Sequence, residues 1–211
     1  MAPMKQTKYT LILASKSPRR IELLGHLSIP FEIIPADIQE DPKESALKLA
    51  ELKGQTVMDD LKKREGFGES FFPFVVSSDT QVRLGETIYG KPADESEAKK
   101  MLQELQGKTH EVITAVYMGR LDVGTGEILH SAFYCTSKVT FEQIDDDILD
   151  HYLQTGDSLD KAGAYGIQGP GLVFISHLEG SYSNVVGFPL AGFLKQLKEF
   201  LGENWRALFY E

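Results

Sequence analysis

Two short apolar runs that stop abruptly in polar residues constrain this chain more than any other feature. The first run, KYTLILAS at residues 8–15, stops at Ser15. The second, FFPFVVSSDTQVRL at residues 71–84, gives way to polar residues from Ser77 onward. Apolar runs of this length, bounded by turn residues and rich in strand formers, predict buried strands. We therefore expect a sheet whose buried strands end where their polar residues begin.

Segments with the apolar spacing of amphipathic helices separate the strands. In the first of them, Pro18 suits the first helical position and Ser17 suits the N-cap. Helices are predicted within residues 18–28, 45–65, 89–105, 145–156 and 187–202, and further strands within residues 31–40, 109–119, 131–143 and 161–180. This interleaved order predicts the α/β class, with a mixed twisted sheet and flanking helices in one domain over residues 1–211. Functional residues are expected where strands end and loops begin.

The formal charge of −9, with acidic residues spread along the chain, argues against several partners. Such a surface repels a nucleic-acid backbone and an anionic membrane, so neither is an expected partner. The single cysteine, Cys135, excludes an internal disulfide framework and is expected to be a buried, inert thiol. No secretory signal begins the sequence and no apolar run is long enough to span a bilayer, so the expected location is the cytoplasm.

Arg19 and Arg20 stand in the first turn of the first predicted helix, where cations are unfavourable. The free N–H groups there already carry partial positive charge, so two arginines oppose the helix dipole. A bound polyphosphate would reverse that effect, and Ser15 offers a hydroxyl beside it. The alternative is that both arginines are solvated, with Arg19 paired to Glu22. The segment lacks the P-loop pattern.

Other candidate residues are less informative when each is taken alone. Asp79 follows the second apolar run, where a carboxylate can cap a turn, bind a metal or act as a general base. Lys53, within a predicted helix, and Lys91, at a turn, are by default solvated. Gln168 lies in the glycine-rich sequence GAYGIQGPG, and its amide can match the edge of uracil or thymine. The histidines have no metal-binding spacing and are expected to be structural or on the surface.

Several segments, taken together, resemble the Maf family of nucleoside triphosphate pyrophosphatases. They are LILASKSPRRIELL, SSDT, GKP, KMLQELQGKTHEVITAV, DKAGAYGIQGPG and EGSYSNVVGFPL. They occur in the family's order and cover nearly the whole chain. The AYGIQG form resembles the branch that acts on dTTP and UTP.

The resemblance implies hydrolysis of a nucleoside triphosphate between its α and β phosphates, with a divalent cation, Mg²⁺ or Mn²⁺. Modified pyrimidine triphosphates are also candidate substrates, and the activity would serve as house-cleaning, which removes unwanted nucleotides from the nucleotide pool. The resemblance further implies an elongated, two-lobed architecture of the Maf/ITPase type with a central cleft, and a homodimer. The alternative function is a nucleotide-binding regulatory module in cell-division control, without significant turnover.

Matching the motifs residue by residue carries the family's roles onto this sequence. Asp79 matches the proton acceptor. Arg19, Thr80 and Gln168 match positions that the family associates with substrate preference. Glu40, in an acidic loop, matches a cleft carboxylate and is, with Asp79, a candidate metal ligand.

The remaining matches are polar residues that line the family's phosphate cleft: Ser15, Arg20, Lys53 and Lys91. Three positions depart from the family's pattern. Lys16 stands where a small residue is common, Gln81 where an aliphatic residue is usual, and Gly54 where alanine is typical. None of them removes a residue with an implied role, but Lys16 and Gln81 leave the fine substrate preference open.

Overall fold

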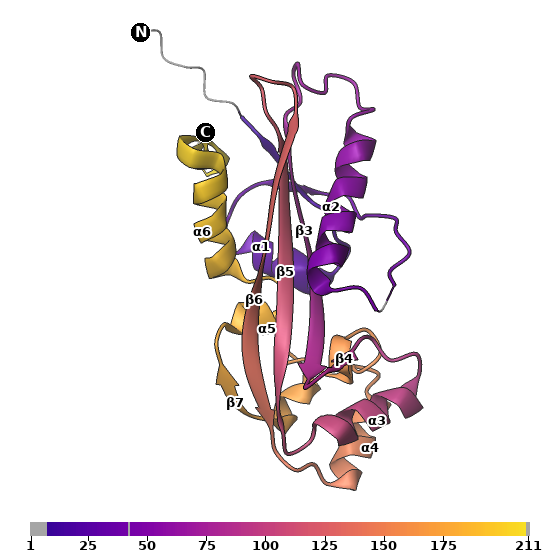
Figure 1. Ribbon diagram of the computed structural model, residues 1–211. Helices are drawn as coiled ribbons and strands as arrows, with labels where there is room; N and C mark the ends of the chain where they lie inside the picture. The colour runs from indigo at the N-terminus through magenta and orange to yellow at the C-terminus, as the bar shows by residue number, and fades with distance from the viewer. Residues whose placement is uncertain (1–7, 42, 210–211) are drawn as a thin grey trace.

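Three long strands, β3 (Pro73–Leu84), β5 (Thr109–Leu121) and β6 (Ile128–Phe141), run the length of the molecule (Figure 1). The structure, a computed structural model, describes residues 8–41 and 43–209. The shorter strands are β1 (Thr10–Leu13), β2 (Phe31–Ile33), β4 (Thr87–Tyr89) and β7 (Ile175–Glu179). All seven form one sheet in the order β2-β1-β3-β5-β6-β7, with β4 paired to β3. β1 runs parallel to β2 and β3 and the other pairs are antiparallel, which confirms the predicted mixed sheet.

Apart from α5, the helices lie within the predicted segments, with boundaries shifted by a few residues. They are α1 (Pro18–Gly25), α2 (Ala46–Leu61), α3 (Glu95–Leu105), α4 (Asp146–Gln154), α5 (Tyr182–Val186) and α6 (Leu190–Leu201), with 3-10 turns η1 (Ala162–Ala164), η2 (Pro170–Phe174) and η3 (Gly202–Leu208). The short elements β4 and α5 have no counterpart in the sequence prediction, because three to five residues carry too little periodicity to be recognised.

Hydrophobic cores at opposite ends of the sheet define two lobes. One core packs α1 and α6 against β1, with α2 over the opposite face. The other packs α3 and α4 around fully buried Leu102, and truncation of such a leucine to alanine typically costs about 2–5 kcal/mol. Figure 1 shows α2 and α6 on opposite sides of the long strands, with α3 and α4 at the far end. The expected elongated, two-lobed architecture is confirmed. One domain over residues 1–211 stays a prediction, since residues 1–7, 42 and 210–211 lie outside the described chain.

The expectation that β3 ends at its polar residues is wrong, because the strand continues to Leu84. Its far edge stays hydrogen-bonded to β5 from Phe74 to Arg83, so the backbone has partners throughout. On the near edge, β1 pairs with residues 73–76 and β4 with residues 82–84. Between them, residues 77–81 face no other strand in the part of the chain that the structure describes. Asp79 therefore lies in the middle of a strand, at the point where the sheet is open along one edge.

Two expectations drawn from composition can be compared with the fold. Cys135 lies on β6 as predicted, but it is half-buried rather than buried, and that burial raises the pKa of its thiol. None of the helices in the described ranges has both the length and the apolar character needed to cross a membrane.

Candidate functional site

A cavity of about 580 Å³, here called the cleft, opens along the unpaired stretch of β3. Its walls come from the turn between β1 and α1, the acidic loop before α2, α2 itself, β3, the glycine-rich loop around η1, and α5. Because the edge of β3 is open here, side chains from both faces of the strand reach the same cavity. Every site residue expected from the sequence lines the cleft: Ser15, Arg19, Arg20, Glu40, Lys53, Asp79, Thr80, Lys91 and Gln168.

Lys53 is buried between two carboxylates. Its ammonium Nζ lies 2.7 Å from Asp79 Oδ1 and 3.0 Å from Glu40 Oε1. The side chains of Lys53 and Asp79 are only 10% and 9% exposed, so the default of a solvated Lys53 is wrong. Burial alone would raise the pKa of Glu40, but the hydrogen bond and charge of Lys53 outweigh it and hold that pKa below its ordinary value. A capping or turn role for Asp79 is also wrong, because its carboxylate bonds Lys53 from the middle of β3.

The approach of α2 to the sheet explains how Lys53 reaches this position. At the next residue, Gly54, a Cβ atom would lie 2.1 Å from Cδ1 of Tyr117, a fully buried ring on β5. Alanine at this position would therefore clash unless the helix moved away from the sheet. The departure at Gly54 is thus matched to Tyr117, and together they let α2 bring its lysine against β3.

Gln81 fixes the beginning of the same helix. Its Nε2 donates to the carbonyl of Glu44 at 2.6 Å, and its Oε1 accepts from the backbone N–H of Ala46 at 2.9 Å. The bond from Ala46 satisfies an N–H of the first turn of α2, where backbone N–H groups lack helical partners, and the bond to Glu44 holds the residue before the N-cap. An aliphatic residue, as is usual here in the family, could make neither contact, so this departure has a structural role on the face of β3 that carries Asp79.

The opposite face of β3 binds Arg20. Its Nη2 donates to Thr80 Oγ1 at 3.3 Å, and its Nε donates to the carbonyl of Gly187 at 3.1 Å. Thr80 Oγ1 also lies 3.0 Å from Thr114 Oγ1, and Ser78 donates to the same Gly187 carbonyl. Burial lowers the pKa of Arg20, and the charge of Asp79 opposes that shift. We call Lys53, Asp79, Arg20 and Thr80 the cleft floor.

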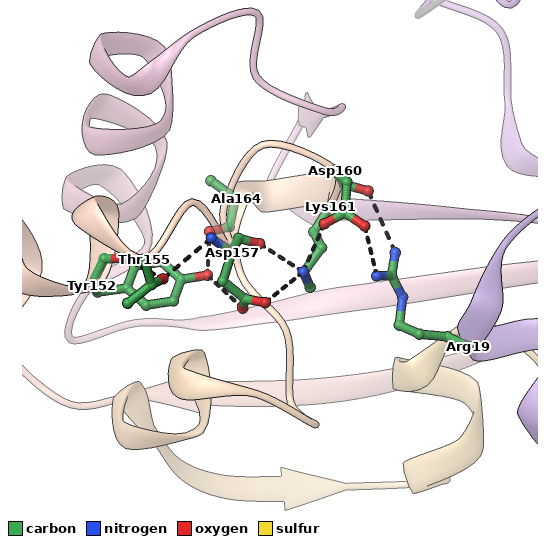
Figure 2. Close-up of polar contacts among 7 residues, drawn as sticks. All are labelled: Arg19, Tyr152, Thr155, Asp157, Asp160, Lys161 and Ala164. Atoms are coloured by element: carbon green, nitrogen blue, oxygen red, sulfur yellow. Dashed lines mark hydrogen bonds and ion pairs between the residues drawn. The ribbon is translucent and has the colours of Figure 1, made fainter.

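The cleft mouth, defined as Arg19, Lys91 and Gln168, is more open. Arg19 does not pair with Glu22. Its Nη1 lies 2.9 Å from Asp160 Oδ2, and this ion pair is drawn in Figure 2. Lys91 and Gln168 are exposed, and within the described ranges neither side chain makes a hydrogen bond or ion pair with the protein. The Lys91 ammonium and the Gln168 amide are therefore available to bind a ligand or water.

The start of α1 is capped differently from the expectation that Ser17 acts as the N-cap. Ser17 occupies the N-cap position of α1, but its side chain makes no capping hydrogen bond. Ser15 is buried, and its hydroxyl accepts from the backbone N–H of Ser17 at 3.2 Å. With Pro18 following and no acidic residue in its first turn, α1 supplies no carboxylate of its own to its free N–H groups, which favours an external anion there.

An aromatic pair supports the wall of the cleft near Gln168. Tyr165 lines the cavity, and its hydroxyl lies 2.7 Å from Nε2 of His110, a buried residue of β5. Burial lowers the pKa of His110 to about 4, so the ring is neutral at pH 7. The expectation of a structural role fits His110. Tyr165 and Asp160 lie inside the motif DKAGAYGIQGPG, but the spacing of its residues does not distinguish them as site residues.

The donor set for a divalent cation is small. Within residues 8–41 and 43–209 no group of three or more His, Cys, Asp or Glu side chains is placed to hold a metal. Glu40 and Asp79 do face the same ammonium group, so their oxygens lie on one side of the cleft. Mg²⁺ commonly uses one or two carboxylates and takes its other ligands from substrate phosphates and water. The two carboxylates fit a cation that a phosphate ligand helps to hold.

A mixed sheet open along one strand, with a buried carboxylate and several cations around one cleft, defines an α/β protein suited to bind a polyanion. The Maf-like protein family matches residues 10–200. The chain therefore belongs to the Maf family.

Individual relatives agree with this assignment. The chain is 39% identical over 196 residues to a protein of Bacillus cereus named dTTP/UTP pyrophosphatase, covering 90% of this chain and 95% of that protein. It is 40% identical over 195 residues to a protein of the same name from Bacillus cytotoxicus, covering 90% and 94%. A third, from Bacillus thuringiensis subsp. konkukian, has the same name and is 39% identical over 197 residues, covering 90% and 95%.

Proposed function

We propose that this chain is a nucleoside triphosphate pyrophosphatase that hydrolyses dTTP and UTP to the monophosphate and pyrophosphate. The observation that carries the proposal is the buried pair of Asp79 and Lys53, 2.7 Å apart, on the floor of a cleft that also holds two arginines. The relatives named dTTP/UTP pyrophosphatase cover 90% of the chain and support the choice of substrate. Modified pyrimidine triphosphates remain candidate substrates within the same proposal.

The cations of the cleft provide local binding for a triphosphate in a chain of formal charge −9. Arg20 and Lys53 are fixed by protein partners, so their donors are oriented before a ligand arrives. Preorganised donors of this kind stabilise charge that develops on phosphate oxygens without having to reorganise during the reaction. Arg19 and Lys91 add positive charge at the mouth, where the ligand enters.

Asp79 is suited to accept a proton from an attacking water. Lys53 holds Oδ1 of its carboxylate, whereas in the described part of the chain no residue hydrogen-bonds Oδ2. The free oxygen can accept a hydrogen bond from water while the bound oxygen keeps the carboxylate in one orientation. A positioned general base of this kind typically contributes about 10²–10⁴-fold to the rate.

A divalent cation, Mg²⁺ or Mn²⁺, held by Glu40 and Asp79 together with phosphate oxygens, would supply neutralisation of the charge on the phosphates. Glu40 is suited to that task because it lines the cleft with a side chain that is 44% exposed. Its lowered pKa also favours the ionised carboxylate. Lys53 would then hold both carboxylates in place between the helix and the strand.

We place the base of the nucleotide against one wall of the cleft, beside Gln168 of the cleft mouth. Tyr165, Ile167 and Val82 offer an apolar wall, and Gln168 stands beside it with a free amide. An amide can donate and accept at once, which matches the adjacent carbonyl and N–H of uracil or thymine. The cytoplasmic location and the homodimer stay predictions.

The test is pyrophosphate release by the purified chain with Mg²⁺ or Mn²⁺ on a panel of canonical and modified triphosphates. We expect dTTP and UTP to be turned over faster than ATP or GTP. Absence of release from every pyrimidine triphosphate, with binding retained, would instead favour the regulatory module, which the names of the relatives do not favour.

The variant Asp79→Asn tests the base. It should fold, because asparagine can still accept from Lys53, yet lose about 10²–10⁴-fold of the turnover. Asp60→Asn is a matched control, since this exposed carboxylate pairs with Lys63 outside the cleft. Near-normal turnover by Asp79→Asn would remove Asp79 as the base.

A further inference from the structure

Arg19 joins the two sides of the cleft mouth through one ion pair. α1 carries Arg19, and the facing residue Asp160 lies in the glycine-rich loop, 141 positions later in the chain. Besides the 2.9 Å contact between Nη1 and Oδ2, Nη2 of Arg19 donates to the backbone carbonyl of Asp160 at 3.4 Å. Figure 2 shows the guanidinium turned toward both oxygens.

Asp160 is itself fixed from behind by Lys161. The ammonium of Lys161 lies 2.7 Å from Asp160 Oδ1 and 2.8 Å from Asp157 Oδ1, and it donates to the Asp157 carbonyl at 2.6 Å. The lysine stem passes beneath Gly166, where a Cβ atom would lie 2.6 Å from its Cε. Figure 2 shows this chain of contacts continuing to Tyr152, whose hydroxyl bonds Asp157. The Asp160 carboxylate is therefore held in place rather than free to follow Arg19.

This carboxylate is an anion at the entrance of a site for anions. Burial alone would raise the pKa of Asp160, but its hydrogen bonds and ion pairs with Lys161 and Arg19 outweigh that and lower it, so the group is ionised at pH 7. A phosphate that contacts Arg19 meets this negative charge at the same guanidinium. Like charges so close are unfavourable, and one of the two anions has to yield.

We propose that Asp160 competes with substrate phosphate for Arg19, and so sets how tightly the cleft retains a polyphosphate. In this role Asp160 is a positioning residue, since it acts on the ligand through Arg19. The inference rests on the proposed function for its class of ligand, a polyphosphate. It carries a consequence for turnover: the carboxylate takes Arg19 back as products leave, which favours their release.

The test is titration of the full chain with inorganic tripolyphosphate, without divalent cation, by isothermal calorimetry. Asp160→Asn should bind roughly two- to fivefold more tightly than the wild type, the range set by a partly exposed ion pair. Asparagine keeps an oxygen for Lys161, which also retains both contacts with Asp157, so the loop should stay in place. A structural lesion would weaken binding, so a gain in affinity separates the proposed role from damage to the loop.

Two controls distinguish competition from general repulsion. Glu22→Gln removes one exposed charge from the same turn of helix, and among the described residues Glu22 makes no hydrogen bond or ion pair with Arg19, so its effect should be smaller. In an Arg19→Ala background the gain from Asp160→Asn should shrink, because the contested group is gone. Unchanged or weaker binding by Asp160→Asn, an equal effect from Glu22→Gln, or an undiminished gain in the Arg19→Ala background would overturn the inference.

The same titrations separate this inference from the proposed function. Tripolyphosphate carries no base and is not hydrolysed as a nucleotide, so its affinity does not depend on dTTP or UTP turnover. If Asp160→Asn tightens binding in a chain that hydrolyses neither nucleotide, the inference stands and the function falls. If turnover is found and binding is not tightened, the function stands and the inference falls.

Discussion

The cleft floor and the cleft mouth carry similar charges but are held in different ways. On the floor, Lys53 and Arg20 each contact a partner from another element, and Asp79 is 9% exposed. At the mouth, Arg19 has one partly exposed ion pair, while Lys91 and Gln168 are exposed. Floor residues therefore contribute to folding as well as to chemistry. Mouth residues can exchange their contacts with water or protein for contacts with a ligand. Substitutions in the two regions should separate stability from binding.

The largest effect on stability is expected from Lys53→Met. It leaves Asp79 and Glu40 facing each other without the ammonium between them, and breaking a buried pair costs about 3 kcal/mol. Urea unfolding should show this loss in the free energy of unfolding. Lys48→Met, an exposed lysine of the same helix, should change stability by less than about 0.5 kcal/mol. Equal effects of the two substitutions would erase the distinction between the floor and the surface.

Acid should weaken the wall behind the mouth through His110. The unfolded histidine binds a proton near its ordinary pKa of about 6.5, whereas the folded residue binds one only near pH 4. Because the folded pKa is lowered, this contribution to stability is complete above pH 6.5 and is lost as pH falls toward 4. The loss amounts to roughly 3 kcal/mol at one pKa unit per 1.36 kcal/mol.

His110→Gln isolates that contribution, since glutamine can still bond the Tyr165 hydroxyl but does not titrate. Denaturant unfolding from pH 7.5 to 4 should show the wild type losing more stability than the variant. The carboxylates titrate in both proteins, so the difference between the two curves belongs to His110. Parallel curves would show that His110 does not control the acid response of this wall.

Arg20→Ala and Arg19→Ala compare the floor with the mouth directly. Removal of Arg20 takes a charged donor from Thr80 and from the Gly187 carbonyl, which should cost about 1–3 kcal/mol. Removal of Arg19 breaks one partly exposed ion pair and should cost at most about 1 kcal/mol. Both should weaken binding of a triphosphate. Thermal unfolding that ranks Arg19 above Arg20 would reverse the comparison.

The smallest change is expected from Gln168→Ala, because the exposed Gln168 side chain makes no hydrogen bond or ion pair within the described ranges. Its stability should stay within about 0.5 kcal/mol of the wild type. Loss of a hydrogen bond to the base should lower the preference for UTP over ATP by roughly three- to tenfold. The ratio of kcat/KM values for the two nucleotides measures this. Equal losses on both would remove Gln168 from base selection.

Periodicity in the sequence is enough to predict the fold class, but not the extent of β3. Its residues become polar at Ser77, but the strand continues because β5 keeps pairing with it. Ser77 also donates to a backbone carbonyl of α2, and Ser78 donates to the carbonyl of Gly187, the residue after α5. These partners, in α2 and directly after α5, are far from β3 in the chain. A pattern that measures only local hydrophobicity cannot register them.

The site could be predicted only as a set of residues, not as a geometry. All residues expected from the motifs line the cleft. Helical spacing, however, would place Lys53 on the protein surface. Its burial depends on Gly54 and on the ring of Tyr117, which are brought together only by folding. The partner of Arg19 could not be predicted for a similar reason, since Asp160 is 141 positions away and no helical spacing points to it.

The alternating direction of side chains along β3 limits where the sequence can gain or lose a residue. Asp79 and Thr80 are neighbours in sequence, yet one reaches Lys53 on α2 and the other reaches Arg20 on α1. Successive strand residues point to opposite faces, so inserting or deleting a single residue upstream within β3 would exchange the carboxylate and the hydroxyl between the two walls. The turn between β5 and β6 can change length without such an exchange. The spacing between Phe74 and Val82 is therefore as much a part of the site as the side chains themselves.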